Sequence, residues 1–340
     1  MSQLLSNLHV NRPLTDYLVS FDPSKIGYAR DIVWPKKPVE KLSNQLRSIA
    51  REQLLRSYNG KVNAQGRVTR VDFATGPTDT YNCEVFAFEA LLDAIEQENA
   101  DAELQYMLQK QRAPIAAMNV WLERLAIETQ LRDTSLFTQY DPVGTDTTRL
   151  WSSPAAGNSN PFLDLLTACK TVSSQAQQKA NVVLMDHYVW AEVINHPVIQ
   201  KLVNFWSNGS IITSEILERM LGDWIEPGSI HIYRARYNAA NQGATEAWTS
   251  FMHADVFVGF KDQPGIETWG YGSRFQWNML AGDDPAIVFE FPTYDAPLGG
   301  RVMRTVTAVD YHPHLVNASK TGYLLTGVVD TTLARFNGEL

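Results

Sequence analysis

The stretch that decides the fold is "NVVLMDHYVWAEVINHPVI", residues 181–199. Its apolar run at residues 182–185 is short, partly β-branched and bounded by polar residues, which predicts a buried strand. The apolar residues that follow recur at helical spacing until Pro197, which lacks the amide that a continuing helix needs. The stretch therefore predicts a strand, a turn and a helix that ends at Pro197.

Length and composition predict a globular chain that can bury a large core. The chain has 340 residues, of which 44% are hydrophobic and 19% charged, and this size suits one large or two ordinary domains. No apolar run reaches the roughly 20 residues that span a bilayer, and the first residues lack a secretory pattern. We therefore expect the protein to be synthesised in the cytoplasm and not to associate with a membrane. Cys83 and Cys169 lie far apart without a C-x-x-C motif, so we expect reduced core residues.

The charge is unevenly distributed along the chain. Between residues 25 and 70 the net charge is +8, which leaves −16 for the rest of a chain whose total is −8. A basic segment of this kind could bind nucleic acid or lie on the acidic body of an identical neighbour. The segment contains no recognisable nucleic-acid module and the chain has a pI of 5.4, so the second interpretation is preferred.

The leading part of the chain predicts segments that do not pack on their own. Residues 1–45 contain four prolines and few periodic apolar positions, which indicates an extended arm rather than a packed element. Residues 42–55 could form a short helix. Beyond them, the positions from Val62 to Phe73 predict two weak strands joined by a polar turn. Because such a hairpin is marginal in water, we expect it to dock on a neighbouring subunit, with a mobile surface loop as the alternative.

Two helices are predicted next, followed by a mixed α/β half. The spacing predicts a helix over 85–95 and a second over about 103–132, in which Pro114 marks a kink or the first turn of the main portion. At 1.5 Å per residue, the second helix would be about 45 Å long and act as a spine. A short helix should follow Thr213 or Ser214 and stop at Gly222. Strands are expected at 229–237, 255–260, 286–291, 302–309 and 323–329.

The best candidate for catalytic chemistry is a His-x-Asp pair, His253 and Asp255. With His312 or His314 as a distant third ligand, it would suit a non-haem iron oxygenase. Alternation along a strand would place His253 and Asp255 on one face. This signal is short, and no arginine suited to a 2-oxoglutarate carboxylate follows. We therefore expect neither a metal nor a cofactor.

The other histidine cluster and the glycine-rich stretches are interpreted as architecture. His187 and His196 are separated by a strand-to-helix turn, and His196 should lie at a helix end, near exposed carbonyl groups. Asp186 is assigned to the same architecture. No G-x-S-x-G motif or P-loop is present. The chain is therefore not expected to be an enzyme.

The order of these pieces resembles a known family. The pieces are "TDTYNCEVFAFEALLDAIEQENAD", "ERLAIETQLRDTSLF", "NVVLMDHYVWAEVINHPVIQKL", "WIEPGSIHIYRARYN", "DVFVGF", "WGYGSRFQW" and "GYLLTGVV". In this order and spacing, they resemble the major capsid proteins of tailed bacteriophages, which have the Hong Kong 97-type fold. The resemblance covers most of the chain.

The resemblance implies an α+β fold with four parts. These are an N-terminal arm (1–45), an extended β-hairpin loop (46–80), a peripheral domain with the spine helix (81–160 and 305–340) and an axial domain (161–304). The implied function is self-assembly into hexamers and pentamers that form an icosahedral shell around phage double-stranded DNA. An encapsulin-type compartment shell, built on the same fold, is an alternative.

The resemblance also implies partners and a location. We expect contacts with identical copies, a separate scaffolding protein, a portal, possibly a cement protein, and packaged DNA held non-specifically on the inner face. The protein would assemble in the host cytoplasm and reside in the virion. The candidate inter-subunit contacts are the basic residues Lys36, Lys37, Arg56, Lys61, Arg67 and Arg70.

Overall fold

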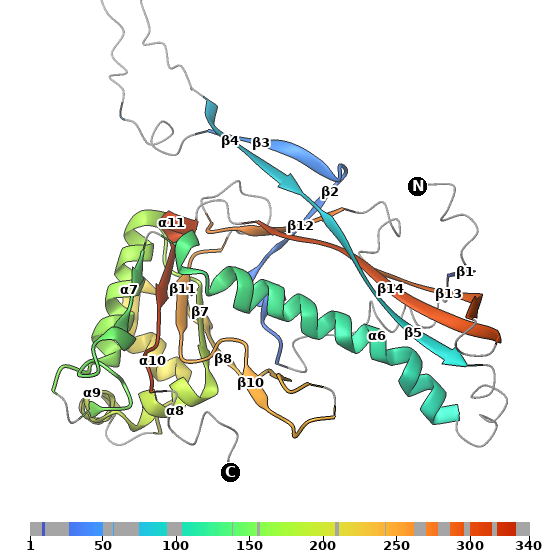
Figure 1. Ribbon diagram of the computed structural model, residues 1–340. Helices are drawn as coiled ribbons and strands as arrows, with labels where there is room; N and C mark the ends of the chain where they lie inside the picture. Colours follow the sequence, from blue (N-terminus) through green and yellow to red (C-terminus); the bar gives the residue numbers. More distant parts are fainter. Residues whose placement is uncertain are drawn as a thin grey trace, which may run out of the picture.

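The structure is a computed structural model. It describes residues 9–10, 27–49, 57, 75–93, 104–137, 139–154, 157–207, 211–241, 243–261, 270–277, 286–295, 300–314 and 318–330. Figure 1 shows a compact part in which helices cover a sheet, and a long twisted sheet that runs beside helix α6. None of the helices in the described part combines the length and apolar character needed to cross a bilayer.

A five-stranded sheet with the order β6-β15-β11-β7-β8 forms the centre of the compact part. Strand β7 (Val182–Asp186), which lies between β11 and β8, is the strand predicted at the start of the deciding stretch, and all of its residues are buried. It pairs antiparallel with β11 and parallel with β8. The sheet consists of β6 (Tyr140–Asp141), β7, β8 (Ile230–Tyr233), β11 (Val256–Gly259) and β15 (Gly322–Leu325).

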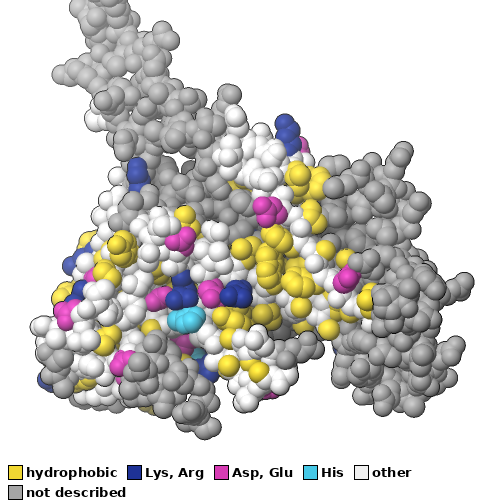
Figure 2. All heavy atoms as spheres, viewed as in Figure 1, with side chains coloured by type: hydrophobic (Ala, Val, Ile, Leu, Met, Phe, Trp, Pro, Cys, Tyr) yellow, Lys and Arg dark blue, Asp and Glu magenta, His cyan; other side chains and the backbone are white. Residues whose placement is uncertain are grey.

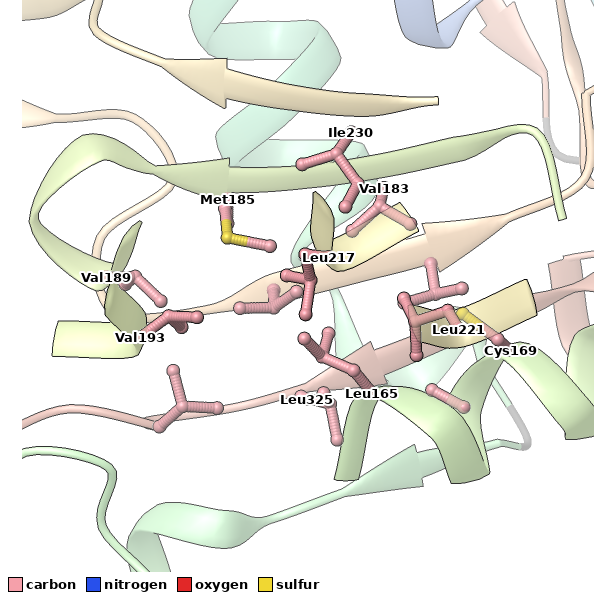
Figure 3. Close-up of a cluster of buried hydrophobic side chains, with 14 of the residues drawn as sticks. Leu165, Cys169, Val183, Met185, Val189, Val193, Leu217, Leu221, Ile230 and Leu325 are labelled. Carbon is pink, nitrogen blue, oxygen red and sulfur yellow. The ribbon is translucent and has the colours of Figure 1, made fainter. Parts of the chain in front are cut away.

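Helices cover one face of this sheet. They are α7 (Pro161–Ala176), α8 (His187–Asn195), α9 (Pro197–Ser207) and α10 (Ser214–Leu221). Figure 3 shows side chains from these helices, among them Leu165, Val189 and Leu217, gathered against Val183 and Met185 of β7. The predicted strand, turn and helix are confirmed, and Pro197 begins the next helix, where a missing amide costs nothing.

The predicted short helix after residue 213 is confirmed as well. The Thr213 hydroxyl accepts a hydrogen bond from the amide of Ile216 at 3.4 Å and caps α10. Gly222 follows the last residue of α10 with a φ of 63°, a conformation that glycine adopts without steric cost. The predicted strand at 229–237 is divided between β8 and β9 (Arg236–Asn238), and β9 pairs with β10 (Trp248–Ser250).

The other face of the central sheet packs on the predicted spine. Helix α6 (Leu104–Arg124) continues as the π-helical segment η3 (Leu125–Leu131), so the long helix predicted at 103–132 is confirmed. Pro114 lies inside α6. Val182 and Leu184, which alternate with the residues facing α7 to α10, share a core with α6 and η3. Because a strand presents its side chains alternately to two sides, β7 is buried between two helical layers.

The long sheet contains a correction to the sequence analysis. Residues predicted as a helix at 85–95 form strand β5 (Glu84–Asp93), which pairs along its whole length with β14 (Gly300–His314). On its other side, β14 pairs with β13 (Ala286–Asp295). The rings of Phe86 and Phe88, two residues apart, lie 4.2 and 6.4 Å from the ring of Trp121 on α6. The apolar residues of this segment are spaced three and four apart, as in a helix. The alternating aromatic residues and the ten residue pairs with β14 nevertheless make it a strand.

A second correction concerns the residues predicted as a short helix at 42–55. Residues Ser43–Ile49 form strand β3, which pairs antiparallel with β4 (Thr75–Asn82). We call this pair the β3–β4 ribbon. Its register runs from Ser43 opposite Asn82 to Ile49 opposite Thr75, so the ribbon flanks residues 50–74. The two weak strands predicted between residues 62 and 73 lie outside the described residues.

The four-part division of the chain stays a prediction. Its boundary between residues 304 and 305 falls within β14, and the residues on both sides of it pair with β5 and β13. Strand β14 also extends to pair with β12 (Ser273–Trp277), which in turn pairs with β2 (Lys36–Val39). A short strand, β1 (His9–Val10), pairs with β13 at the edge of the sheet.

Candidate assembly surfaces

The segment that leads into the ribbon, residues 27–42, is anchored on helix α6; we call it the root segment. Its residues 30–33 form the short helix α3 (Arg30–Val33). The Arg30 guanidinium donates to the backbone carbonyl and side-chain oxygen of Asn119, at 3.0 and 2.5 Å. The Glu123 carboxylate accepts from the amides of Ala29 and Arg30, at 2.8 and 3.3 Å, and from the Tyr233 hydroxyl at 2.9 Å. One carboxylate therefore joins the root segment, the spine and strand β8.

The electrostatics of this junction are set by burial. Glu123 is fully buried, and loss of solvent raises the pKa of its carboxyl group, although the amides, Arg30 and the Tyr233 hydroxyl act in the opposite direction. Burial, together with the charge of Glu123, also raises the pKa of Tyr233 well above its usual value. The junction therefore keeps Tyr233 protonated as a hydrogen-bond donor.

Trp34 anchors the next part of the root segment. The side chain is fully buried, and its indole N–H donates to the carbonyl of Ala126 at 3.0 Å. Its ring meets Tyr271 edge-on, with centroids 5.5 Å apart, and the Tyr271 hydroxyl donates to the carbonyl of Val33. The expectation of an unpacked arm over residues 1–45 is therefore wrong for residues 27–34, because their aromatic and apolar side chains complete the core beside α6.

The base of the ribbon is fastened by aromatic residues. Tyr81 stacks on Phe275 with ring centroids 4.7 Å apart, and its hydroxyl donates to the carbonyl of Lys41 at 3.1 Å. The Trp277 indole donates to the carbonyl of Glu40 at 3.1 Å. Beyond this base, β3 and β4 form a sheet of two strands. The direction in which the ribbon leaves the body is therefore fixed at its root.

Two of the predicted contact residues lie in β2, immediately before the ribbon. Lys36 is exposed and Lys37 is half-buried. Partial desolvation and the positive charge of Arg274 lower the pKa of Lys36. The Arg274 guanidinium pairs with the Asp31 carboxylate at 2.6 Å. The other four predicted contact residues, Arg56, Lys61, Arg67 and Arg70, lie outside the described residues.

The His-x-Asp pair does not have the strand geometry that iron ligation would need. His253 lies in a turn with a φ of 52°. The two Asp255 oxygens accept from the amide of Gly327, at 2.8 Å, and from the Arg132 side chain, at 2.6 Å. His312 and His314 lie on β14, paired with β12. Within the described residues, no group of three His, Cys, Asp or Glu side chains could hold a metal ion.

Asp255 instead joins η3 to the segment that follows β15, and this gives a testable prediction. Replacing Asp255 with alanine should lower the free energy of unfolding by about 2–3 kcal/mol, because a partly buried amide and a guanidinium lose their acceptor. Asp255→Asn keeps an acceptor for Gly327 and should lose less. Urea unfolding without added metal measures both. An alanine variant as stable as the wild type would contradict this role.

The other histidine cluster is structural. The Asp186 carboxylate caps α8 by accepting from the amide of Tyr188 at 2.9 Å, and its other oxygen accepts from the Ser250 hydroxyl. Burial lowers the pKa of His196, whose ring lies 3.1 Å from the Ser159 hydroxyl and accepts from the amide of Val198 at 3.3 Å. The sequence suggested that His196 would lie near the exposed carbonyl groups at a helix end. In the structure, its ring accepts a hydrogen bond from an amide of α9.

Sequence reasoning missed two apolar surfaces. Figure 2 shows hydrophobic side chains gathered in the region of α6, where Val120, Trp121, Phe86 and Phe88 are only partly buried. The second surface lies at the end of α9 and in the segment that follows it, where Phe205 and Ile211 are 86% and 85% exposed. The signal for the second was available in the sequence, because the stretch around it is almost free of charge.

Comparisons with known proteins place the fold. No protein-family model matches the sequence, and a search of curated proteins gives no match. A phage-related protein from Bordetella bronchiseptica matches with 18% identity over 94% of this chain and 97% of its own, at a TM-score of 0.66. The holo-SrpI encapsulin complex from Synechococcus elongatus matches with 10% identity over 96% and 98%, at 0.51.

A third match is a viral capsid. The capsid structure of cyanophage P-SCSP1u matches with 12% identity over 86% of both chains, at a TM-score of 0.50. At these identities the matches establish architecture. The chain therefore has the fold of a phage capsid protein and of an encapsulin, which is the Hong Kong 97-type fold that the order of its sequence pieces resembles.

Proposed function

We propose that this chain is a major capsid protein, a non-enzymatic subunit that assembles into hexamers and pentamers of an icosahedral shell around phage double-stranded DNA. The observation that carries the proposal is the β3–β4 ribbon, fastened at its base and built of two strands. A ribbon of two strands is marginal in water unless it packs on another surface. An identical neighbour supplies that surface.

The root segment explains how the ribbon reaches a neighbour in a defined direction. The clamp of Arg30 on Asn119, and of Glu123 on Ala29, fixes the chain to the spine shortly before β3 begins. A rigid base joined to a thin ribbon sets the contact while tolerating small changes of angle between copies, as rings of five and six require.

Basic residues around the ribbon support the same contact. Lys36 and Lys37 lie at its root, and the +8 net charge of residues 25–70 contrasts with the acidic remainder of the chain. We propose that Lys36 and Lys37, with Arg56, Lys61, Arg67 and Arg70, lie against the acidic body of the next copy. The proposal includes the four-part domain division given above. Its further partners would be a scaffolding protein, a portal, possibly a cement protein, and DNA held on the inner face of the shell. The protein would assemble in the host cytoplasm and reside in the virion.

An encapsulin-type compartment is the second candidate. The observation in its favour is that the encapsulin matches a larger share of this chain than the cyanophage capsid does, at a comparable TM-score. Both candidates predict a closed shell. They differ in what the shell encloses, which is DNA in one case and a cargo protein in the other.

Purified full-length protein tests the proposal by sedimentation and electron microscopy. We expect rings of five and six, or closed particles in the megadalton range. A monomer or small oligomer under the same conditions would contradict a shell function. Particles recovered from infected or lysogenic cells that protect DNA from nuclease favour the capsid, and particles that enclose a protein favour the compartment.

A matched variant isolates the ribbon. Ile49 and Thr75 are paired, so residues 50–74 can be replaced by a two-residue Asn-Gly turn that closes the hairpin. The variant should keep the thermal stability of the wild-type protomer and lose closed particles. If normal particles form, the part of the chain beyond the ribbon base is not the inter-subunit contact.

A further inference from the structure

The end of helix α9 carries an apolar projection beside a hollow. Phe205 is 86% exposed although Ile199 and Val203, on the same helix, are buried in the core. Beside it lies a groove of about 310 Å³, lined by Ile194, Gln200, Val203, Asn204, Ile211 and Ile212. Because the Phe205 side chain is almost fully exposed, it does not fill the groove of its own chain.

The surface around this pair is almost free of charge. Residues 193–214 contain Lys201 as their one Asp, Glu, Lys or Arg, in a chain that is 19% charged. The polar groups at the groove are amides, such as those of Gln200 and Asn204. Copies arranged around a rotation axis bring the same region of each chain close together, where like charges would face one another and repel. A neutral surface of amides and apolar groups suits contact between identical copies.

The position of α9 leaves room for such a contact beside the one made by the ribbon. In Figure 1, α9 lies at the end of the compact part that is far from β13 and β14, and the β3–β4 ribbon extends from the opposite side. A protomer can therefore engage one neighbour through the ribbon and meet others through α9.

We propose that a second copy of this chain occupies the groove, with Phe205 of one protomer inserted between Ile194, Ile211 and Ile212 of the next. The contact is head-to-tail, so repeating it around an axis closes a ring. This inference rests on the proposed shell function and assigns the residues that hold each ring together. A buried aromatic side chain in an apolar groove is the usual form of an energetic hot spot.

Engineered cysteines test the geometry of the contact directly. Gln200 and Phe205 lie five positions apart on one helix, so their side chains face different directions and should not form a disulfide within a chain. The native Cys83 and Cys169 are buried. In a variant with Gln200→Cys and Phe205→Cys, mild oxidation should give a ladder of covalent oligomers that ends at five or six chains. Single-cysteine variants should give no ladder, because the lone cysteine then faces a residue other than cysteine on the next chain.

Substitution at Phe205 tests its energetic part. Phe205→Asp should abolish rings and particles while leaving the melting temperature of the protomer unchanged, because the side chain is exposed. Phe205→Leu, which keeps an apolar projection, should still assemble. The contact would be overturned if Phe205→Asp formed normal particles and the cysteine pair gave no ladder. The shell function would still stand in that case, provided that the wild-type protein forms particles. Absence of wild-type particles would overturn both.

Discussion

Replacing Trp34 with alanine is expected to lower the free energy of unfolding by about 3–5 kcal/mol, the usual cost of deleting a large buried aromatic side chain. The indole fills the core beside α6, meets Tyr271 edge-on and donates to the carbonyl of Ala126. Its loss opens a cavity and leaves that carbonyl without its donor. The root segment should then separate from the spine, so the ribbon would lose its fixed direction.

Urea unfolding and limited proteolysis measure this effect. The alanine variant should unfold at lower urea concentration and be cleaved within residues 27–42 while the rest of the chain is still folded. Trp34→Phe, which keeps a ring but loses the indole donor, should cost less. Trp248→Ala is the matched control, because Trp248 is 48% exposed. Equal losses for Trp34→Ala and Trp248→Ala would show that the root segment is not anchored by Trp34.

The parts of the fold that could be predicted are those whose local pattern agrees with their tertiary setting. Strand β7 is a continuous apolar run because both of its faces are covered. The spine has an apolar stripe of helical period, and Pro114 lies within it. In each case one signal points to one structure, and the family resemblance followed from the order of such pieces.

The failures have a common physical cause. Strand β5 carries apolar residues that fit a helix, but its partner β14 lies more than 200 residues later in the sequence. Strand β3 is polar and gains its structure from β4. Prolines in the leading segment suggested an extended arm, and the burial of Trp34 depends on a surface formed by η3 and Tyr271. Long-range pairing leaves little trace in a local window.

The candidate surfaces were only partly accessible for the same reason. Charge alone drew attention to the basic leading segment, including Lys36 and Lys37. The groove beside Phe205 requires residues from α8, α9 and the segment after residue 210 to converge, and no spacing rule predicts that. Glu123 is the clearest example. It holds Ala29 and Arg30, which lie more than 90 residues away in the sequence, so its neighbours along the helix do not reveal this role.

Replacing Glu123 should separate the contribution of its hydrogen bonds from that of its charge. Glu123→Ala removes the acceptor of the Ala29 and Arg30 amides and of the Tyr233 hydroxyl, and all three residues are buried. A loss of about 3–5 kcal/mol is expected, because each buried donor left without an acceptor costs about 1–3 kcal/mol. Glu123→Gln keeps an oxygen for the two shorter bonds, to the amide of Ala29 and the Tyr233 hydroxyl. It should therefore be much more stable than the alanine variant.

The glutamine variant should also change how stability depends on pH. Burial raises the pKa of Glu123 in the folded protein, so between the ordinary glutamate pKa and the raised value the folded chain binds more protons than the unfolded chain. The contribution of Glu123 to wild-type stability is thus fully present at low pH and is lost as pH rises through the folded pKa. Glu123→Gln lacks this titration, so the stability difference, wild type minus variant, should fall with rising pH across that window and be flat on either side.

Urea unfolding of both proteins over a pH series measures this difference. A difference that rises with pH would mean that Arg30 and the amides outweigh desolvation, and that the ionised carboxylate is the form the folded junction prefers.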